Sequence, residues 1–116
     1  MGYEQRTATE GMIFRKTNSE KGRKISVTPD NSPMRHLAYG RIILDKSRPS
    51  ANFATGARES GLICISGEAT VTVDGKPFAL GKFDAMYVPR DSTVEVITNS
   101  TADLSEFSAE VAKKYP

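Results

Sequence analysis

Four charged side chains have the types needed for acid–base chemistry on an anionic substrate. Glu59 could act as a general base, and Arg41, Arg58 and Arg90 could each bind a substrate carboxylate through paired hydrogen bonds. A plainer interpretation is open for three of them. Glu59 and the adjacent Arg58 could form an ion pair at a strand end, and Arg90 could be solvated in a turn. Glu59 is therefore a catalytic candidate and the arginines are ligand-binding candidates.

The chain offers little for metal or thiol chemistry. It has one histidine, His36, and one cysteine, Cys64. A catalytic metal needs several imidazole or carboxylate ligands, which one histidine does not supply. Cys64 has no basic neighbour in its strand, so we interpret it as a small core residue and His36 as a structural or surface residue. We expect no metal and no cofactor.

Length and composition indicate one soluble domain. The 116 residues are 38 % hydrophobic and 26 % charged, which suits a single modest core. No apolar run is long enough to cross a bilayer, and residues 1–10 are too polar for a secretory signal. A single cysteine excludes an internal disulfide and agrees with a reducing compartment. We expect a cytoplasmic protein that does not act at a membrane.

The net charge of +2 is mild, but part of the positive charge gathers near the N-terminus. The basic residues of this segment are Arg15, Lys16, Lys21, Arg23 and Lys24. A nucleic-acid-binding segment would interleave aromatic side chains with the basic ones, whereas here only Phe14 is near and Glu20 interrupts the run. A solvated loop is the better interpretation, and we expect no nucleic-acid partner.

Hydrophobic alternation of period two predicts an all-β chain. The predicted strands are residues 11–16, 24–28, 37–44, 62–66, 69–73, 78–80, 85–88, 93–98 and 104–111. Residues 45–57, with Pro49 and Gly56, are predicted to form a long loop, and 103–114 is the one segment where a short helix could compete. The pattern predicts an N-terminal arm over residues 1–24, on its own domain or exchanged with a neighbour, and a barrel over 25–116.

The strand that contains Cys64 is apolar on both faces. One face carries Glu59, Gly61, Ile63 and Ile65, and the other carries Leu62 and Cys64. Such a strand is expected to be buried on both sides. One side would face the inside of the barrel, and the other would face neighbouring strands or a partner subunit.

Residues 67–75 read GEATVTVDG, and Glu59 lies eight residues before them. The nonapeptide matches a typical cupin hairpin, and Glu59 occupies the place of the glutamate in the first cupin motif. The chain thus resembles the cupin family, which implies a double-stranded β-helix, or jelly-roll barrel. Cupin metal sites also use histidines, which would fall near Asn52 and Ala54 and at Val94. None of these positions holds an imidazole, so we expect a metal-free cupin.

The order of segments more narrowly resembles the N-terminal half of two-cupin sugar-acid isomerases. These are 5-deoxyglucuronate isomerase of inositol breakdown and 5-keto-4-deoxyuronate isomerase of pectin breakdown. The matching pieces are ISVTPDNSP (25–33), YGRIIL (39–44), GARESG (56–61) and GKFDAMYVP (81–89). In the last piece we interpret Asp84 and Tyr87 as turn-capping and packing residues. The resemblance implies that this half is metal-free and that the metal ligands belong to a C-terminal half.

Three functions remain open. The first is a metal-free cupin domain that contributes structure or assembly, expected as a homodimer and not as a complete catalyst. The second is a binding module whose lumen, lined by Ile63, Ile65 and Val94, holds a small sugar acid. The third is a metal-independent aldose–ketose isomerase that uses Glu59 as its base.

Overall fold

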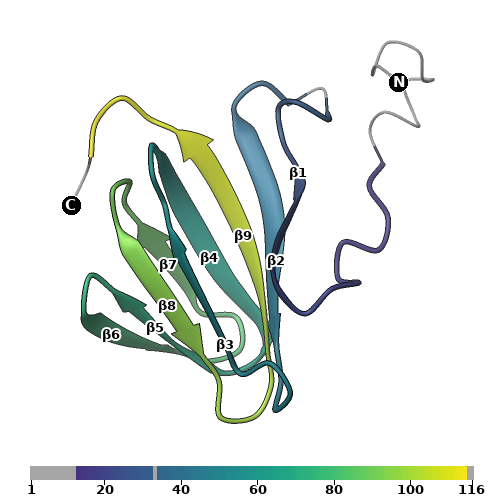
Figure 1. Cartoon of the computed structure of the whole chain (residues 1–116), viewed down its shortest axis with the longest axis vertical. Coiled ribbons are helices and arrows are strands. Elements are labelled where there is room, and N and C mark those ends of the chain that lie inside the picture. The colour runs from purple at the N-terminus through teal and green to yellow at the C-terminus, as the bar shows by residue number, and fades with distance from the viewer. Residues whose placement is uncertain (1–12, 33, 115–116) are drawn as a thin grey trace.

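The computed structural model describes residues 13–32 and 34–114, which form two antiparallel β-sheets packed face to face (Figure 1). The five-stranded sheet has the order β1 (Gly22–Val27), β2 (Leu37–Leu44), β9 (Ala102–Glu110), β4 (Arg58–Gly67) and β7 (Ala85–Val88). The four-stranded sheet has the order β3 (Ser50–Ala54), β8 (Thr93–Ile97), β5 (Ala69–Val73) and β6 (Lys76–Leu80). The predicted all-β jelly roll is confirmed, as two sheets that do not close into a barrel.

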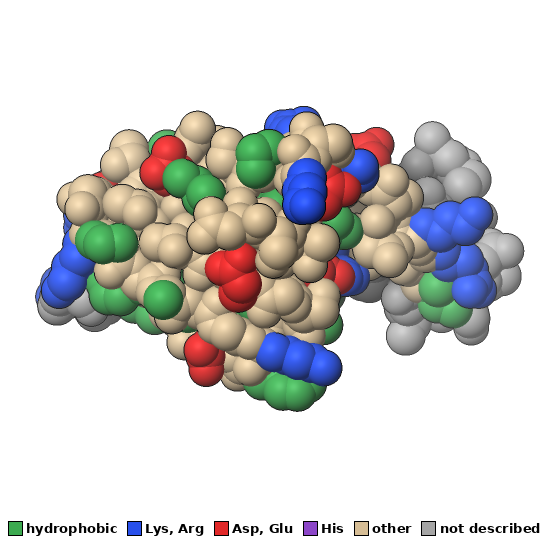
Figure 2. Space-filling view, turned by 90° about the horizontal axis from the view of Figure 1, so that it is seen from below, with side chains coloured by type: hydrophobic (Ala, Val, Ile, Leu, Met, Phe, Trp, Pro, Cys, Tyr) green, Lys and Arg blue, Asp and Glu red, His purple; other side chains and the backbone are tan. Residues whose placement is uncertain are grey.

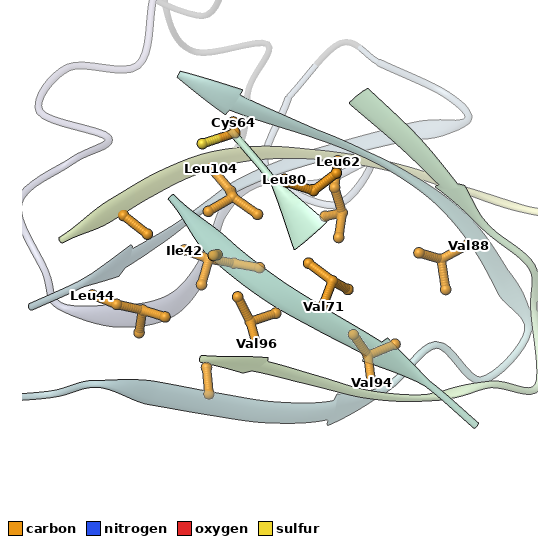
Figure 3. Packing of buried hydrophobic residues seen from close by; sticks show 13 residues of the cluster. Ile42, Leu44, Leu62, Cys64, Val71, Leu80, Val88, Val94, Val96 and Leu104 are labelled. Atoms are coloured by element: carbon orange, nitrogen blue, oxygen red, sulfur yellow. The ribbon is translucent and has the colours of Figure 1, made fainter. Parts of the chain in front are cut away.

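Apolar side chains from both sheets fill the space between them (Figure 3). The fully enclosed members include Ile42, Leu44, Leu62, Cys64, Val71, Val88, Val96 and Leu104. They come from every second residue of their strands, as the pleat of a strand requires. The two sheets therefore share one continuous core, and strand alternation decides which residues enter it.

The turn between β5 and β6 confirms the predicted hairpin. Asp74 and Gly75 have φ angles of 49° and 85°, and a two-residue hairpin turn of this handedness favours Asn or Asp followed by Gly. The Asp74 carboxylate also accepts hydrogen bonds from the Thr93 amide (2.8 Å) and hydroxyl (3.1 Å). These bonds lower the pKa of Asp74 and fasten the turn to β8.

Two local predictions are corrected, and a third is confirmed. Residues 13–16 form no strand, and residues 11–12 of that predicted element lie outside the described residues. The predicted loop over 45–57 contains strand β3, which pairs along its whole length with β8. The predicted strand 104–111 is confirmed as part of β9, and the short helix that could have competed over 103–114 does not form, because β2 and β4 pair with β9 on both sides. For β3, tertiary pairing overrides a weak local signal.

The surface is mixed in charge where Figure 2 shows it, with acidic and basic side chains interspersed over that end of the molecule. Lys24 of the basic N-terminal segment pairs with Glu20, and Lys21 pairs with Asp45. Among the described residues, no helix has the length and apolarity needed to cross a bilayer.

Candidate functional site

The inner face of the sandwich is where a cupin-like site was expected, and its side chains are unsuited to holding a metal. Phe53 of β3 packs against the core, Ser60 of β4 is buried, and Val94 of β8 is a core member. The exposed Asn52 and Ala54 flank Phe53 in the strand. An aromatic ring, a hydroxyl and an isopropyl group do not form the imidazole and carboxylate donor set that a cupin metal requires. No group of three or more potential metal ligands occurs among the described residues.

Glu59 lies on the outer face of the five-stranded sheet. Its neighbour Ser60 is 4 % exposed and points inward with Leu62, so Glu59 takes the opposite side of β4. The Tyr87 hydroxyl donates a 2.9 Å hydrogen bond to Glu59 Oε1. The carboxylate therefore lies beside a shallow surface hollow of about 160 Å³ and not in the lumen.

Arg41 also lies on the outer face, but another side chain of the same sheet already engages it. Its guanidinium forms a two-pronged ion pair with Asp103 of β9, and the Nε–Oδ1 distance is 2.9 Å. Hydrogen bonding to Asp103 raises the pKa of Arg41 above its usual value. Both donors that would bind a ligand carboxylate are occupied by this pair.

The other two arginines are held at the edges of the sandwich. Arg58 donates from Nε to the Ser108 hydroxyl (3.1 Å) and from Nη2 to the Ser108 carbonyl (3.1 Å). Arg90 donates from Nε to the carboxylate of Asp91 (3.0 Å) and from Nη1 to the Val111 carbonyl. Both side chains are about three-quarters buried and anchor neighbouring backbone.

The four sequence-predicted site residues do not converge. Strand register places Glu59 of β4 opposite Ala109 of β9 and Arg41 of β2 opposite Ser105 of β9. These two partners are four residues apart along β9, so the side chains of Glu59 and Arg41 are not neighbours. Arg58 belongs to the inner face and Arg90 to the turn before β8. One further prediction is wrong, because Ile63 is 38 % exposed on the outer face and does not line the lumen. Val94 does face inward as predicted.

The remaining predictions concern a cysteine, an aspartate and the one histidine. Cys64 is fully buried, and burial raises the pKa of its thiol, so it is a core residue as predicted. Asp84 accepts a 2.8 Å hydrogen bond from the Gly81 amide, which confirms its capping role in the turn. His36 is exposed, and its backbone carbonyl accepts from Arg58 Nη2.

Sequence reasoning missed a buried ion pair at the inner face. Glu106 is fully buried, and Arg23 donates from Nε and Nη2 to its two oxygens, both at 2.8 Å. The Arg23 guanidinium also stacks 4.0 Å from the centre of the Phe53 ring. The group thus ties β1, β9 and β3 together and closes one side of the inner space. The available signal was an isolated glutamate at an inward position of a strand, between Leu104 and Ser108.

Comparisons with known proteins agree with this fold. The sequence model of the KduI/IolB family matches residues 12–116. No match was found among curated proteins. A cupin protein from Bacteroides fragilis is similar in structure, with a TM-score of 0.67, 13 % identity, and coverage of 90 % of this chain and 86 % of that one.

Two further solved structures are similar at the level of the fold. The EutQ protein of Clostridium difficile has a TM-score of 0.61 and 14 % identity, over 78 % of this chain and 62 % of its own. The cupin domain of Cnp3 from Schizosaccharomyces pombe has a TM-score of 0.60 and 16 % identity, over 66 % of this chain and 58 % of its own. The chain thus spans about three-fifths of the length of these two proteins.

Proposed function

The chain belongs to the KduI/IolB family, and we propose that it is a metal-free cupin domain of carbohydrate metabolism that serves structure and assembly. In this proposal it is not a complete sugar-acid isomerase. Its partner is a second copy of itself, and its compartment is the cytoplasm.

The observation that carries the proposal is the filled inner face. A cupin that performs chemistry needs a polar, open lumen in which metal and substrate can meet. Here Phe53 and Val94 stand at inward positions of β3 and β8, and the space between the sheets holds the hydrophobic core (Figure 3). Ser60, rather than the acidic Glu59, faces inward from β4. The residues present therefore favour packing over catalysis.

The candidate residues support the same interpretation. Isomerisation of a sugar acid requires a base near the migrating proton and cations near the carboxylate and the developing enediolate. Glu59 is bonded to Tyr87 on the outer face, and Arg41 is neutralised by Asp103. Arg58 and Glu59 point to opposite faces of β4, so one sugar-sized ligand would not reach both side chains.

The test is metal analysis of the purified 116-residue chain together with a thermal-shift screen against glucuronate and galacturonate. We expect less than stoichiometric zinc, manganese, iron or nickel, and no shift of the melting temperature with either uronate. A Glu59→Gln variant should behave like the wild type in both measurements, because Glu59 contacts only the outer surface. Stoichiometric metal would overturn the metal-free proposal.

A uronate shift without metal would replace the assembly function by the alternative, a sugar-acid binding module. Loss of that shift in Glu59→Gln but not in Ser60→Ala would place the sugar on the outer face. A shift that only Ser60→Ala removes would place it between the sheets.

A further inference from the structure

The outer face of the five-stranded sheet carries one row of large side chains interrupted by a glycine. Strand register aligns Tyr39 of β2 with Phe107 of β9, Phe107 with Gly61 of β4, and Gly61 with Tyr87 of β7. The row therefore reads aromatic, aromatic, glycine, aromatic across four neighbouring strands. Since paired residues share a face, all four positions point away from the core.

Phe107 stands out from this row as a fixed projection. It is 42 % exposed although it belongs to the central strand of the sheet. The ring of Tyr39 packs against it, with centroids 5.0 Å apart and planes tilted by 54°. A tilted aromatic contact of this kind fixes the orientation of the exposed ring.

A depression lies beside this projection. A Cβ atom added to Gly61 would meet no atom within 4 Å, so the surface above the glycine is open. Two hollows, of about 380 and 160 Å³, both border Gly61, Phe107 and Tyr87. The projection and the depression are adjacent, because Phe107 and Gly61 are direct partners across the β9–β4 boundary.

We propose that this outer face is the interface with a second copy of the chain. A two-fold axis between the two faces, running along the β9–β4 boundary, superposes β9 of each copy on β4 of the other. Phe107 of each copy then enters the depression above Gly61 of its mate, and Tyr39 covers Tyr87. Phe107 and the depression above Gly61 lie on opposite sides of this axis. A two-fold rotation therefore brings each projection onto the depression of the other copy, which makes the row self-complementary.

The size and polarity of the face suit a copy of the same chain. Strands β2, β9 and β4 have 8, 9 and 10 residues, and with β7 they present roughly 500 Å² of flat sheet before side-chain relief is added. A stable complex buries about 800 Å² per partner, so the projecting rings and the segments that flank this face would have to supply the rest in the proposed dimer. Of its three charged groups, Arg41 and Asp103 pair with each other, and Glu59 accepts a hydrogen bond from Tyr87, so burial leaves none of them without a hydrogen-bond partner.

The outer face of the other sheet has a different character. Its outward positions are mostly polar: Asn52, Thr70, Thr72, Thr93 and Glu95, with Ile97 as the large apolar exception. Ile97 is 39 % exposed, close to the value for Phe107. A charge placed at Ile97 is therefore a matched control for a charge placed at Phe107.

The test measures the mass of the full chain by sedimentation velocity at micromolar concentrations, for the wild type and three variants. Gly61→Val fills the depression with a side chain that strands favour, and its backbone φ is not in the left-handed region. Phe107→Lys removes the projection and should weaken the dimer at least about 30-fold, the effect of losing one interface hot spot. We expect Gly61→Val and Phe107→Lys to be folded monomers by circular dichroism, and Ile97→Lys to remain a dimer.

The inference rests on the proposed assembly function, and the outcomes separate the two. A monomeric wild type at every concentration would overturn both. A wild-type dimer that Gly61→Val and Phe107→Lys leave intact, or that Ile97→Lys disrupts instead, would overturn the assignment of this face and leave the assembly function standing.

Discussion

The inner and outer faces of the five-stranded sheet are built from alternate residues of the same strands, yet they differ in how accessible they are to another molecule. On β4 the inward Leu62 and Cys64 are fully buried, whereas the outward Gly61 and Ile63 lie beside an open hollow. Cupin chemistry belongs to an inner face, and here that face is filled with core side chains (Figure 3). This difference supports the proposal that the domain acts through its outer surface.

The largest loss of stability should come from a substitution on the inner face of the sheet. Leu62→Ala removes a fully buried side chain and leaves a cavity, so the free energy of unfolding should fall by about 4 kcal/mol. The neighbouring Ile63→Ala, on the outer face, should cost about 1 kcal/mol or less in stability while weakening self-association. Chemical denaturation and sedimentation of both variants provide the measurement. Equal losses of stability in the two variants would contradict the assignment of faces.

The next effect concerns the ion pair that closes the inner space. Arg23→Met leaves the fully buried Glu106 carboxylate without its partner, and the free energy of unfolding should fall by about 3 kcal/mol. The adjacent Lys24 pairs with Glu20 at the surface, so Lys24→Met should change stability by less than about 1 kcal/mol. If urea denaturation shows the same small loss for both, the Arg23–Glu106 pair does not hold the inner face closed.

The strands and the fold could be predicted from sequence, but the choice of face could not. Alternation and the Asp74–Gly75 turn were sufficient for most strands and for the hairpin. On β4, however, both faces are apolar, so the alternation of side chains alone did not show that Ser60, and not Glu59, points inward. That choice depends on which side the other sheet covers, a tertiary fact that a local pattern does not contain.

Two other features were outside the reach of local pattern. Strand β3 is only five residues long and follows Pro49, and it forms because β8 offers a complete pairing partner. The ion pair between Arg23 and Glu106 joins residues 83 positions apart, so only the folded chain brings them together. Long-range contacts of this kind are fixed by topology and not by propensity.

A smaller effect should follow acidification, and it should leave the comparison of faces unchanged. Bonds from Lys21 and Ser47 lower the pKa of Asp45, and bonds from Thr93 lower the pKa of Asp74. A carboxylate with a lowered folded-state pKa stabilises the fold above its unfolded pKa, and this stability is lost as the pH falls. Thermal unfolding should therefore shift to lower temperature below about pH 4. Asp74→Asn should flatten this dependence; an unchanged slope in that variant would contradict the assigned cause.

The central claim is tested most directly by methyl NMR of the isoleucine side chains during dilution. Ile63 and Ile97 are matched probes, 38 % and 39 % exposed, on the outer faces of the two sheets. If the five-stranded sheet is the assembly surface, the Ile63 methyl signals shift as the dimer dissociates and those of Ile97 stay in place. Shifts at Ile97 with none at Ile63, or no shift at either, would contradict the account.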